Sequence, residues 1–209
     1  MYNFTFNIPT KIHFGKDTIS SLSELKAYGS KVLLVYGGGS IKKNGLYDTA
    51  MKILKDAGLT VFELSGVEPN PKIETVRKGV EICKNEGIDM VLAIGGGSTI
   101  DCSKVVAAGA RYDDDAWDLV LDGSKVKAAL PIFDVLTLSA TGTEMDPFAV
   151  ISDMSKNEKW GTGSPYMVPT MSILNPEYTF SVSKKQTAAG TADMMSHTTV
   201  SYTHLTLPT

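Results

Sequence analysis

The chain has 209 residues, of which 43% are hydrophobic and 21% are charged, and its formal net charge at pH 7 is -3. This composition is typical of a globular protein that can bury a core, with room for one large domain or for one domain and part of another. The acidic balance, and the lack of a basic run interleaved with aromatic residues, argue against nucleic acid as a partner.

Neither export nor membrane insertion is indicated by the sequence. Residues 1–14 lack the charged start and the apolar stretch of a secretory signal, and the longest apolar runs are far shorter than the roughly 20 residues needed to cross a bilayer. Cys83 and Cys102 lie far apart in predicted helices and form no CxxC pair, so we expect reduced thiols. The sequence therefore predicts a soluble, cytoplasmic protein without a membrane partner.

Strands and helices alternate along most of the chain. The run KVLLVY at 31–36 is continuously apolar after Lys31. Because both faces of such a strand are apolar, it predicts a strand covered by helices on both sides. The predicted elements, in chain order, are one or two edge strands over 2–14 interrupted at Pro9, a short helix over 20–28, a strand over 31–36, a helix over 46–57, a strand over 60–64, a helix over 73–86, a strand over 90–94, a helix over 99–110, a polar surface stretch over 113–127, and strands over 132–138, 149–152 and 172–174. This alternation predicts a Rossmann-like α/β fold, a mostly parallel sheet with helices on both faces.

The pattern changes to continuous helix near residue 180. Residues 184–197 contain no proline and are rich in Ala and Met, which favours a helix. We place a domain boundary near Phe180, so that an α/β domain spans 1–180 and the start of an all-helical domain spans 181–209. Because the Thr-rich residues 201–209 lack the apolar stripe of this helix, we predict that they are a non-native tail and give His204 no role.

Two glycine-rich turns follow predicted buried strands, GGGS at 37–40 and GGGS at 95–98. Ligands of open α/β sheets bind at the carboxyl ends of the strands. Glycine lets the backbone approach a phosphate, and the following helix directs free N–H groups at an anion. Ordinary tight turns are the alternative, since neither turn is the GxGxxG fingerprint. Ser98 can equally serve as a helix cap, with Asp101 stabilising the first turn.

Asp193 and His197 stand four residues apart in the predicted C-terminal helix. This spacing places both side chains on one helix face, where a carboxylate and an imidazole can share a divalent cation. A simple surface pair is the commoner outcome of such spacing, and two ligands are too few for a catalytic site. His13, in an edge strand, is a poor third ligand. If the pair belongs to an active site, we expect it to face the crevice above the glycine turns.

Several motifs occur together in this chain: VYGGGS, VEPNP, GGGSTIDCSK, TLSATGTEMD, LNPEYT and KKQTAAGTADMMSH. In combination they closely resemble the iron-containing (group III) alcohol dehydrogenase family, nearest to its butanol dehydrogenase-like branch, over residues 2 to about 199. The resemblance implies a dinucleotide-binding domain over 1–180, and a helical metal-binding domain of which this chain carries only the beginning.

The resemblance also implies a role for particular residues. Those implied to bind the cofactor are Gly38, Gly39, Ser40 and Asn70 on the adenosine side, Gly96, Gly97 and Ser98 at the pyrophosphate, and Thr137, Thr141 and Lys159 along the ribose and nicotinamide. Asp193 and His197 match the first two of the four metal ligands of the family and are therefore the implied catalytic residues. The other two ligands are histidines farther along than this chain extends.

Two departures from the family pattern bear on the cofactor. NAD-specific relatives often carry an aspartate after the first strand, whereas this chain has the uncharged turn 37–40. A carboxylate there would repel a 2′-phosphate, so its absence favours NADP over NAD. Asp146 stands where similar proteins usually carry Asn, and we give it no cofactor role.

The resemblance implies hydride transfer between NAD(P) and a primary alcohol or aldehyde, with a divalent Fe or Zn ion polarising the substrate oxygen. The assembly that we consider for this chain is a homodimer. The 209-residue chain holds only two of the four implied metal ligands, so we expect the chain itself to be inactive. Two alternatives stay open: an enzyme like dehydroquinate synthase or glycerol-phosphate dehydrogenase, whose phosphorylated substrates favour more basic residues, and a truncated, non-catalytic nucleotide-binding module.

Overall fold

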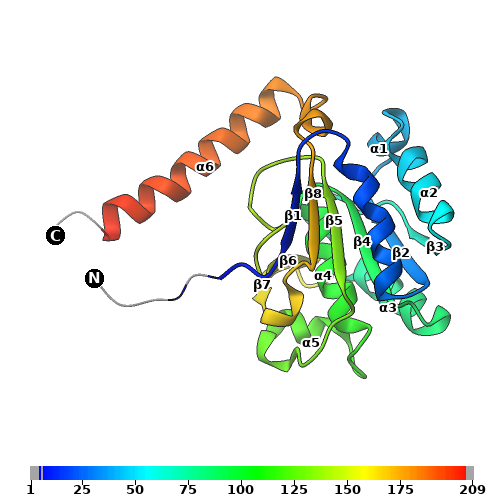
Figure 1. The fold of residues 1–209 in the computed structure, drawn as a ribbon. Helices are drawn as coiled ribbons and strands as arrows, with labels where there is room; N and C mark the ends of the chain where they lie inside the picture. The colour runs from blue at the N-terminus through cyan, green and yellow to red at the C-terminus, as the bar shows by residue number, and fades with distance from the viewer. Residues whose placement is uncertain (1–4, 6, 206–209) are drawn as a thin grey trace.

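A parallel sheet of six strands forms the centre of the computed structural model, which describes residues 5 and 7–205. The strand order is β1-β8-β5-β4-β2-β3, and all neighbours are parallel (Figure 1). The strands are β1 (Lys11–Phe14), β2 (Lys31–Tyr36), β3 (Thr60–Leu64), β4 (Met90–Gly95), β5 (Ile132–Leu136) and β8 (Met171–Leu174). A separate antiparallel hairpin consists of β6 (Phe148–Asp153) and β7 (Glu158–Gly163). The predicted fold class, a mostly parallel α/β sheet, is confirmed.

Helices cover both faces of the sheet because successive strand residues point to opposite sides. Val32 and Leu34 of β2 pack in one cluster with η1 (Thr18–Tyr28) and α2 (Leu46–Asp56). Leu33 and Val35 pack in a second cluster with α3 (Ile73–Glu86), α4 (Gly97–Gly109) and α5 (Ala116–Leu121). All four side chains are fully buried, and burial of each such side chain stabilises the fold by roughly 1.5–3 kcal/mol. The predicted burial of both strand faces is confirmed.

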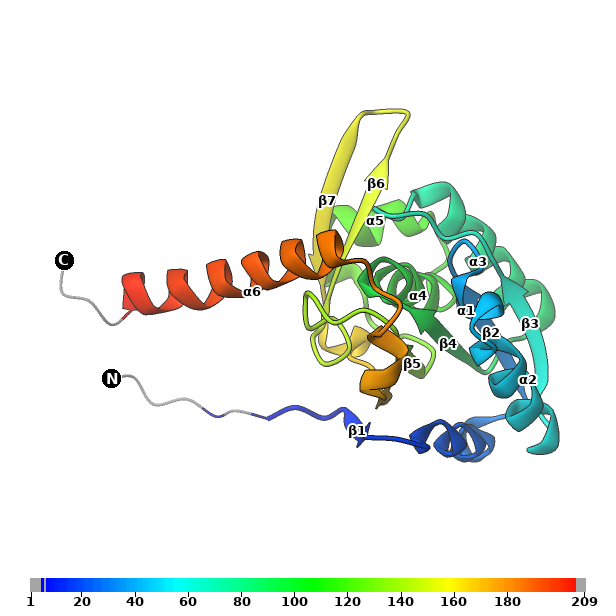
Figure 2. The same cartoon turned by 90° about the horizontal axis from the view of Figure 1, so that it is seen from above.

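The last helix, α6 (Lys184–Leu205), leads away from this body (Figure 2). Most of its side chains up to residue 200 are exposed. The other short elements are α1 (Ser40–Lys43), η2 (Gly123–Lys125), η3 (Pro165–Met167) and η4 (Pro176–Thr179). Within the part of the chain that the structure describes, no helix has the length and apolar character required to cross a membrane.

The elements differ from the sequence-based expectation in a few places. Residues 113–127 are more than a polar surface stretch, because they contain α5, whose Trp117 is buried. Strand β7 has no counterpart among the predicted elements, because its sequence EKWGTG lacks the alternation of apolar and polar residues that indicates a strand. The start of the chain contributes only β1, while residues 1–4 and 6 lie outside the described residues. Helix α6 continues to Leu205, into the segment 201–209 predicted to be a tail, of which 206–209 lie outside the described residues.

Candidate functional site

Both glycine turns lie at one edge of the sheet. Strands β2 and β4 are parallel neighbours whose register runs to Tyr36 and Ile94, and the turns 37–40 and 95–98 follow directly. Strand β5 pairs with the other side of β4, so the segment after β5 reaches the same edge. The structure thus brings together the strand ends at which open α/β sheets bind their ligands.

The turn after β4 is closely packed. A Cβ added at Gly96 would lie 3.1 Å from Cβ of Leu138, and one added at Gly97 would lie 3.2 Å from Oγ1 of Thr141. Glycine therefore lets the segment after β5 approach the beginning of α4. Helix α4 starts at Gly97, directly after β4, so its N-terminus lies at this edge. The amides of Thr99 and Ile100 donate to the carbonyl of Gly96, whereas the N–H groups of Gly97 and Ser98 have no carbonyl one turn earlier in the helix.

The turn after β2 is open. A Cβ added at Gly38 or Gly39 would meet no atom within 4 Å. Gly39 has a φ of 96°, in the left-handed region that favours glycine. The carbonyl of Gly37 accepts a hydrogen bond from the amide of Gly66 at 3.2 Å, which fixes the start of the turn. Its backbone is therefore accessible at the edge.

Three of the residues implied to contact the cofactor are linked by hydrogen bonds although they come from three segments. Nζ of Lys159, in β7, donates to Oδ1 of Asn70 at 2.6 Å. The amide of Asn70 donates to Oγ of Ser98 at 3.3 Å. Asn70 has a φ of 54°, a conformation that Asn adopts more readily than most residues. The hairpin, the loop after β3 and the start of α4 therefore meet at one point.

A cavity of about 380 Å³ brings together Ser40, Gly96 and Thr137, with Gln186 of α6 among its other lining residues. The amide of Thr137 donates to the carbonyl of Gly95 at 2.9 Å, which continues the β4–β5 pairing to the rim of this cavity. Residues implied to lie at the adenosine, pyrophosphate and ribose of the cofactor thus border one space.

The predicted metal ligands are not part of this arrangement. Nε2 of His197 lies 3.6 Å from Oδ1 of Asp193, so both side chains share a helix face as their spacing predicts. They are 79% and 50% exposed on a helix that leads away from the sheet (Figure 1). Neither lines the cavity at the glycine turns, and their role as metal ligands stays a prediction. A carboxylate and an imidazole are donors that fit iron or zinc. Among the described residues, no group of three or more His, Cys, Asp and Glu side chains could hold a metal ion.

A buried lysine in the helix that follows the second glycine turn was not anticipated from the sequence. Lys104 is fully buried in α4. Four acceptors lie 2.8 Å from its Nζ: Oγ1 of Thr143, the carbonyl oxygen and Oδ1 of Asp146, and the carbonyl oxygen of Phe148. All three N–H groups of the ammonium are therefore engaged. Burial lowers the pKa of Lys104, and the hydrogen bond to Asp146 opposes this shift. Asp146, to which we gave no cofactor role, thus pairs with an internal cation.

Asp101 takes part in the same network, which argues against the alternative in which Ser98 caps the helix and Asp101 stabilises its first turn. Its Oδ1 accepts from Oγ1 of Thr143 at 2.7 Å and its Oδ2 accepts from the amide of Val150 at 3.0 Å, so it contacts the β5–β6 segment rather than the first turn of its helix. Burial raises the pKa of Asp101, while these two hydrogen bonds oppose the shift. Ser98 is not the helix cap, because α4 is capped by Gly96. The only local signal was the spacing of Asp101 and Lys104 in DCSK.

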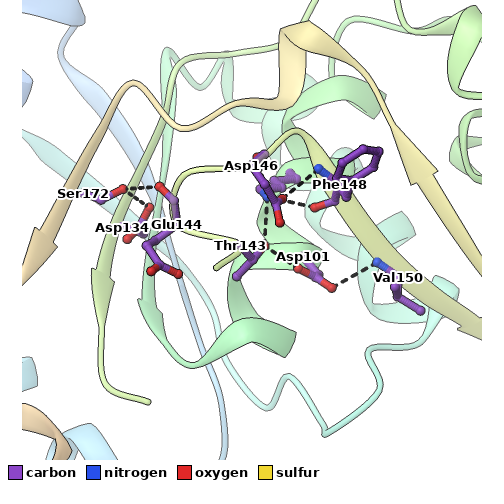
Figure 3. A network of polar contacts seen from close by, with 9 residues as sticks. Asp101, Asp134, Thr143, Glu144, Asp146, Phe148, Val150 and Ser172 are labelled. Carbon is purple, nitrogen blue, oxygen red and sulfur yellow. Dashed lines mark hydrogen bonds and ion pairs between the residues drawn. The ribbon is translucent and has the colours of Figure 1, made fainter. Parts of the chain in front are cut away.

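A second buried polar group lies between β5 and β8. Oγ of Ser172 is 2.6 Å from Oδ2 of Asp134 and 2.8 Å from the carbonyl oxygen of Glu144 (Figure 3). Asp134 is fully buried, and burial raises its pKa well above the usual range. This group joins the β5–β6 segment to the sheet.

Together, the parallel sheet, the glycine turns at its carboxyl edge and the helices on both faces define a Rossmann-like α/β domain. The profile of the family described as iron-containing alcohol dehydrogenase matches residues 9–176. The chain therefore belongs to the iron-containing alcohol dehydrogenase family, which confirms the resemblance.

Individual relatives and solved structures agree with this assignment. The chain is 61% identical over 203 residues to NADH-dependent butanol dehydrogenase A of Clostridium acetobutylicum, covering 97% of this chain and 52% of that protein. It is 40% identical over 205 residues to the NADPH-dependent aldehyde reductase YqhD of Escherichia coli, with 97% and 52% covered. The crystal structure of NADH-dependent butanol dehydrogenase A from Thermotoga maritima superposes with a TM-score of 0.91 at 49% identity, over 94% of this chain and 50% of that one. The chain spans about half the length of the curated relatives it matches.

Proposed function

We propose that this chain is the nucleotide-binding part of an NAD(P)-dependent alcohol dehydrogenase, which transfers a hydride between the cofactor and a primary alcohol or aldehyde. The observation that carries the proposal is the meeting of Lys159, Asn70 and Ser98 beside the start of α4. A lysine, an amide and free helix N–H groups form a set of donors suited to a pyrophosphate and the sugars on either side of it.

In this proposal different segments at the edge of the sheet bind different parts of the cofactor. The open backbone at 38–40 borders the adenosine, and the N-terminus of α4 binds the pyrophosphate. Thr137, Thr141 and Lys159 orient the ribose and nicotinamide. The cofactor carries the hydride, while the protein supplies binding, orientation and electrostatics. A divalent iron or zinc ion, held by Asp193, His197 and further ligands, would polarise the substrate oxygen.

The choice between NAD and NADP depends on the charges near the adenosine side. Glu63, in β3 beside β2, accepts hydrogen bonds from the hydroxyls of Tyr36 at 2.6 Å and Tyr47 at 2.8 Å. Lys42 lies over both rings, 5.0 and 4.4 Å from their centroids. The carboxylate of Glu63 is thus hydrogen-bonded and lies close to a cation, which supports the predicted preference for NADP. The name of the 61%-identical relative points instead to NADH, so both cofactors belong in the test.

Titration of the purified chain with NADH and NADPH, followed by the fluorescence of the reduced nicotinamide, tests cofactor binding. We expect saturable binding, weakened about tenfold or more by Lys159→Met, because a hydrogen bond to a charged group contributes about 1.5–3 kcal/mol. Lys55→Met, at an exposed lysine of α2, is the control and should leave both affinities unchanged. Absence of saturable binding to either nucleotide would refute the proposal.

Activity requires a separate measurement. With Fe²⁺ or Zn²⁺ added, the chain should not reduce butanal at a measurable rate, because Asp193 and His197 are two donors and catalytic zinc usually takes about three protein ligands. Turnover of butanal by this chain alone would contradict the assignment of these two residues to an incomplete metal site. Turnover of a phosphorylated polyol but not of an aldehyde would favour the glycerol-phosphate dehydrogenase alternative.

A further inference from the structure

We infer that Asp101 and Lys104 are positioning residues: from helix α4 they set the place of Thr141 and Lys159, on the nicotinamide side, relative to the phosphate-binding turn where the same helix begins. This inference rests on the proposed function and adds two residues to it that do not themselves contact the cofactor.

Lys104 ties the segment after β5 to the helix. Its ammonium is fully buried, and its Nζ donates to Thr143, Asp146 and Phe148 at 2.8 Å. Two of its four acceptors are backbone carbonyls, those of Asp146 and Phe148. A buried charge is unfavourable unless it is paired and hydrogen-bonded. Lys104 is therefore satisfied only while residues 143–148 stay against α4.

Asp101, one turn earlier on α4, extends this tie to the hairpin. The hydroxyl of Thr143 accepts from Lys104 and donates to Asp101, so the direction of each hydrogen bond is determined (Figure 3). The second carboxylate oxygen of Asp101 accepts from the amide of Val150, in β6. The pair thus contacts both the end of the β5–β6 segment and the start of the hairpin.

These ties lead to the two residues on the nicotinamide side. Thr141 stands two residues before Thr143, and its Oγ1 is 3.2 Å from the position of a Cβ added at Gly97. Lys159 stands on β7, which pairs with β6, and reaches Ser98 through Asn70. Each segment thus lies against α4 at two places, once near the glycine turn and once at Asp101 or Lys104. In our inference the hydrogen bonds at the second place determine where the side chains over the turn lie.

The test compares two ligands that share the phosphate turn but differ in their other half. ADP occupies only the adenosine and pyrophosphate side, whereas NADH also needs Thr141 and Lys159. In Asp101→Asn only one side-chain atom can accept, so either Thr143 or Val150 loses its acceptor. In Thr143→Val the link between Lys104 and Asp101 is lost. We expect either variant to change the Kd for ADP less than about threefold and to weaken NADH about tenfold or more.

A merely structural role would give a different result. Val105→Ala removes a fully buried apolar group from the same helix and is the control, with its unfolding midpoint lowered but the ratio of the two Kd values unchanged. If Asp101→Asn leaves the ratio of the Kd values for ADP and NADH unchanged, the inference is overturned while the proposed function stays intact. If the unaltered chain binds neither ADP nor NADH, the proposed function fails and the inference fails with it.

Discussion

At the scale of single residues, the buried pair of Asp134 and Ser172 raises a question of proton count. The hydroxyl of Ser172 has one proton but lies within hydrogen-bond distance of two oxygens, Oδ2 of Asp134 and the carbonyl of Glu144. A protonated Asp134 resolves this, because it donates to Ser172, which in turn donates to Glu144. The raised pKa of Asp134, caused first by burial, agrees with this arrangement.

We predict that Asp134→Asn flattens the dependence of stability on pH. Because the folded pKa of Asp134 lies above its unfolded value of about 4, its contribution to stability is complete below that value and is lost as pH rises through the folded pKa. Asn stays neutral and can still donate to Ser172. The variant should therefore unfold several degrees above the wild type at pH 8 but not at pH 4, measured by thermal unfolding.

Asp114→Asn, at an exposed carboxylate, should leave the pH profile of the unfolding midpoint unchanged. A parallel fall of the midpoint with pH in the wild type and in Asp134→Asn would show that Asp134 ionises without cost, which would contradict the assigned proton positions.

At the scale of elements, the two glycine turns differ in what occupies the space beside them. Because a methyl group at Gly38 would meet no atom of the chain, we predict that Gly38→Ala keeps the unfolding midpoint. If the adenosine side of the cofactor lies there, the same methyl group should weaken ADP and NADH about tenfold, measured by titration calorimetry or fluorescence. Gly161→Ala, whose Cβ would meet only Val150 at 4.0 Å, is the matched control, and unchanged affinity in Gly38→Ala would refute the placement.

The elements that could be predicted are those with a strong local pattern. The strand over residues 31–36 and the helix over 73–86 have the predicted bounds, because a fully apolar run and a helical period are readable from neighbouring residues. Helix α5 has only six residues, too few for a period to be recognised. Strand β7 contains two glycines and is identified by its pairing with β6 rather than by its own sequence.

The same distinction holds for the site. The glycine turns could be predicted because the chemistry of glycine beside a helix start is local. Lys104 is separated in sequence from its partners Thr143, Asp146 and Phe148 by 39, 42 and 44 positions. These contacts therefore depend on how α4 packs against the β5–β6 segment. No motif of adjacent residues records that packing, and the sequence analysis therefore assigned no role to Lys104.

At the scale of the whole molecule, the sheet body and α6 make unequal contributions to stability. The body contains the large apolar clusters on both faces of the sheet, whereas most α6 side chains up to residue 200 are exposed. We propose that the boundary near Phe180 separates an independently stable domain from the start of another. A chain ending at Ser183 should unfold within about 2 °C of the full 209 residues, measured by calorimetry. A fall of more than about 5 °C would place the boundary elsewhere.

The complete burial of Lys104 also makes it a reporter of global opening. An amine-acylating reagent added to the native protein should modify lysines whose ammonium groups are in water, such as Lys52, which is 77% exposed, and should spare Lys104, which is 0% exposed. Modification at Lys104 then requires that residues 143–148 separate from α4. Mass spectrometry of the peptide that contains Lys104 should yield a labelling rate that follows the unfolding equilibrium. The labelling of this one internal side chain would then report how often the fold opens.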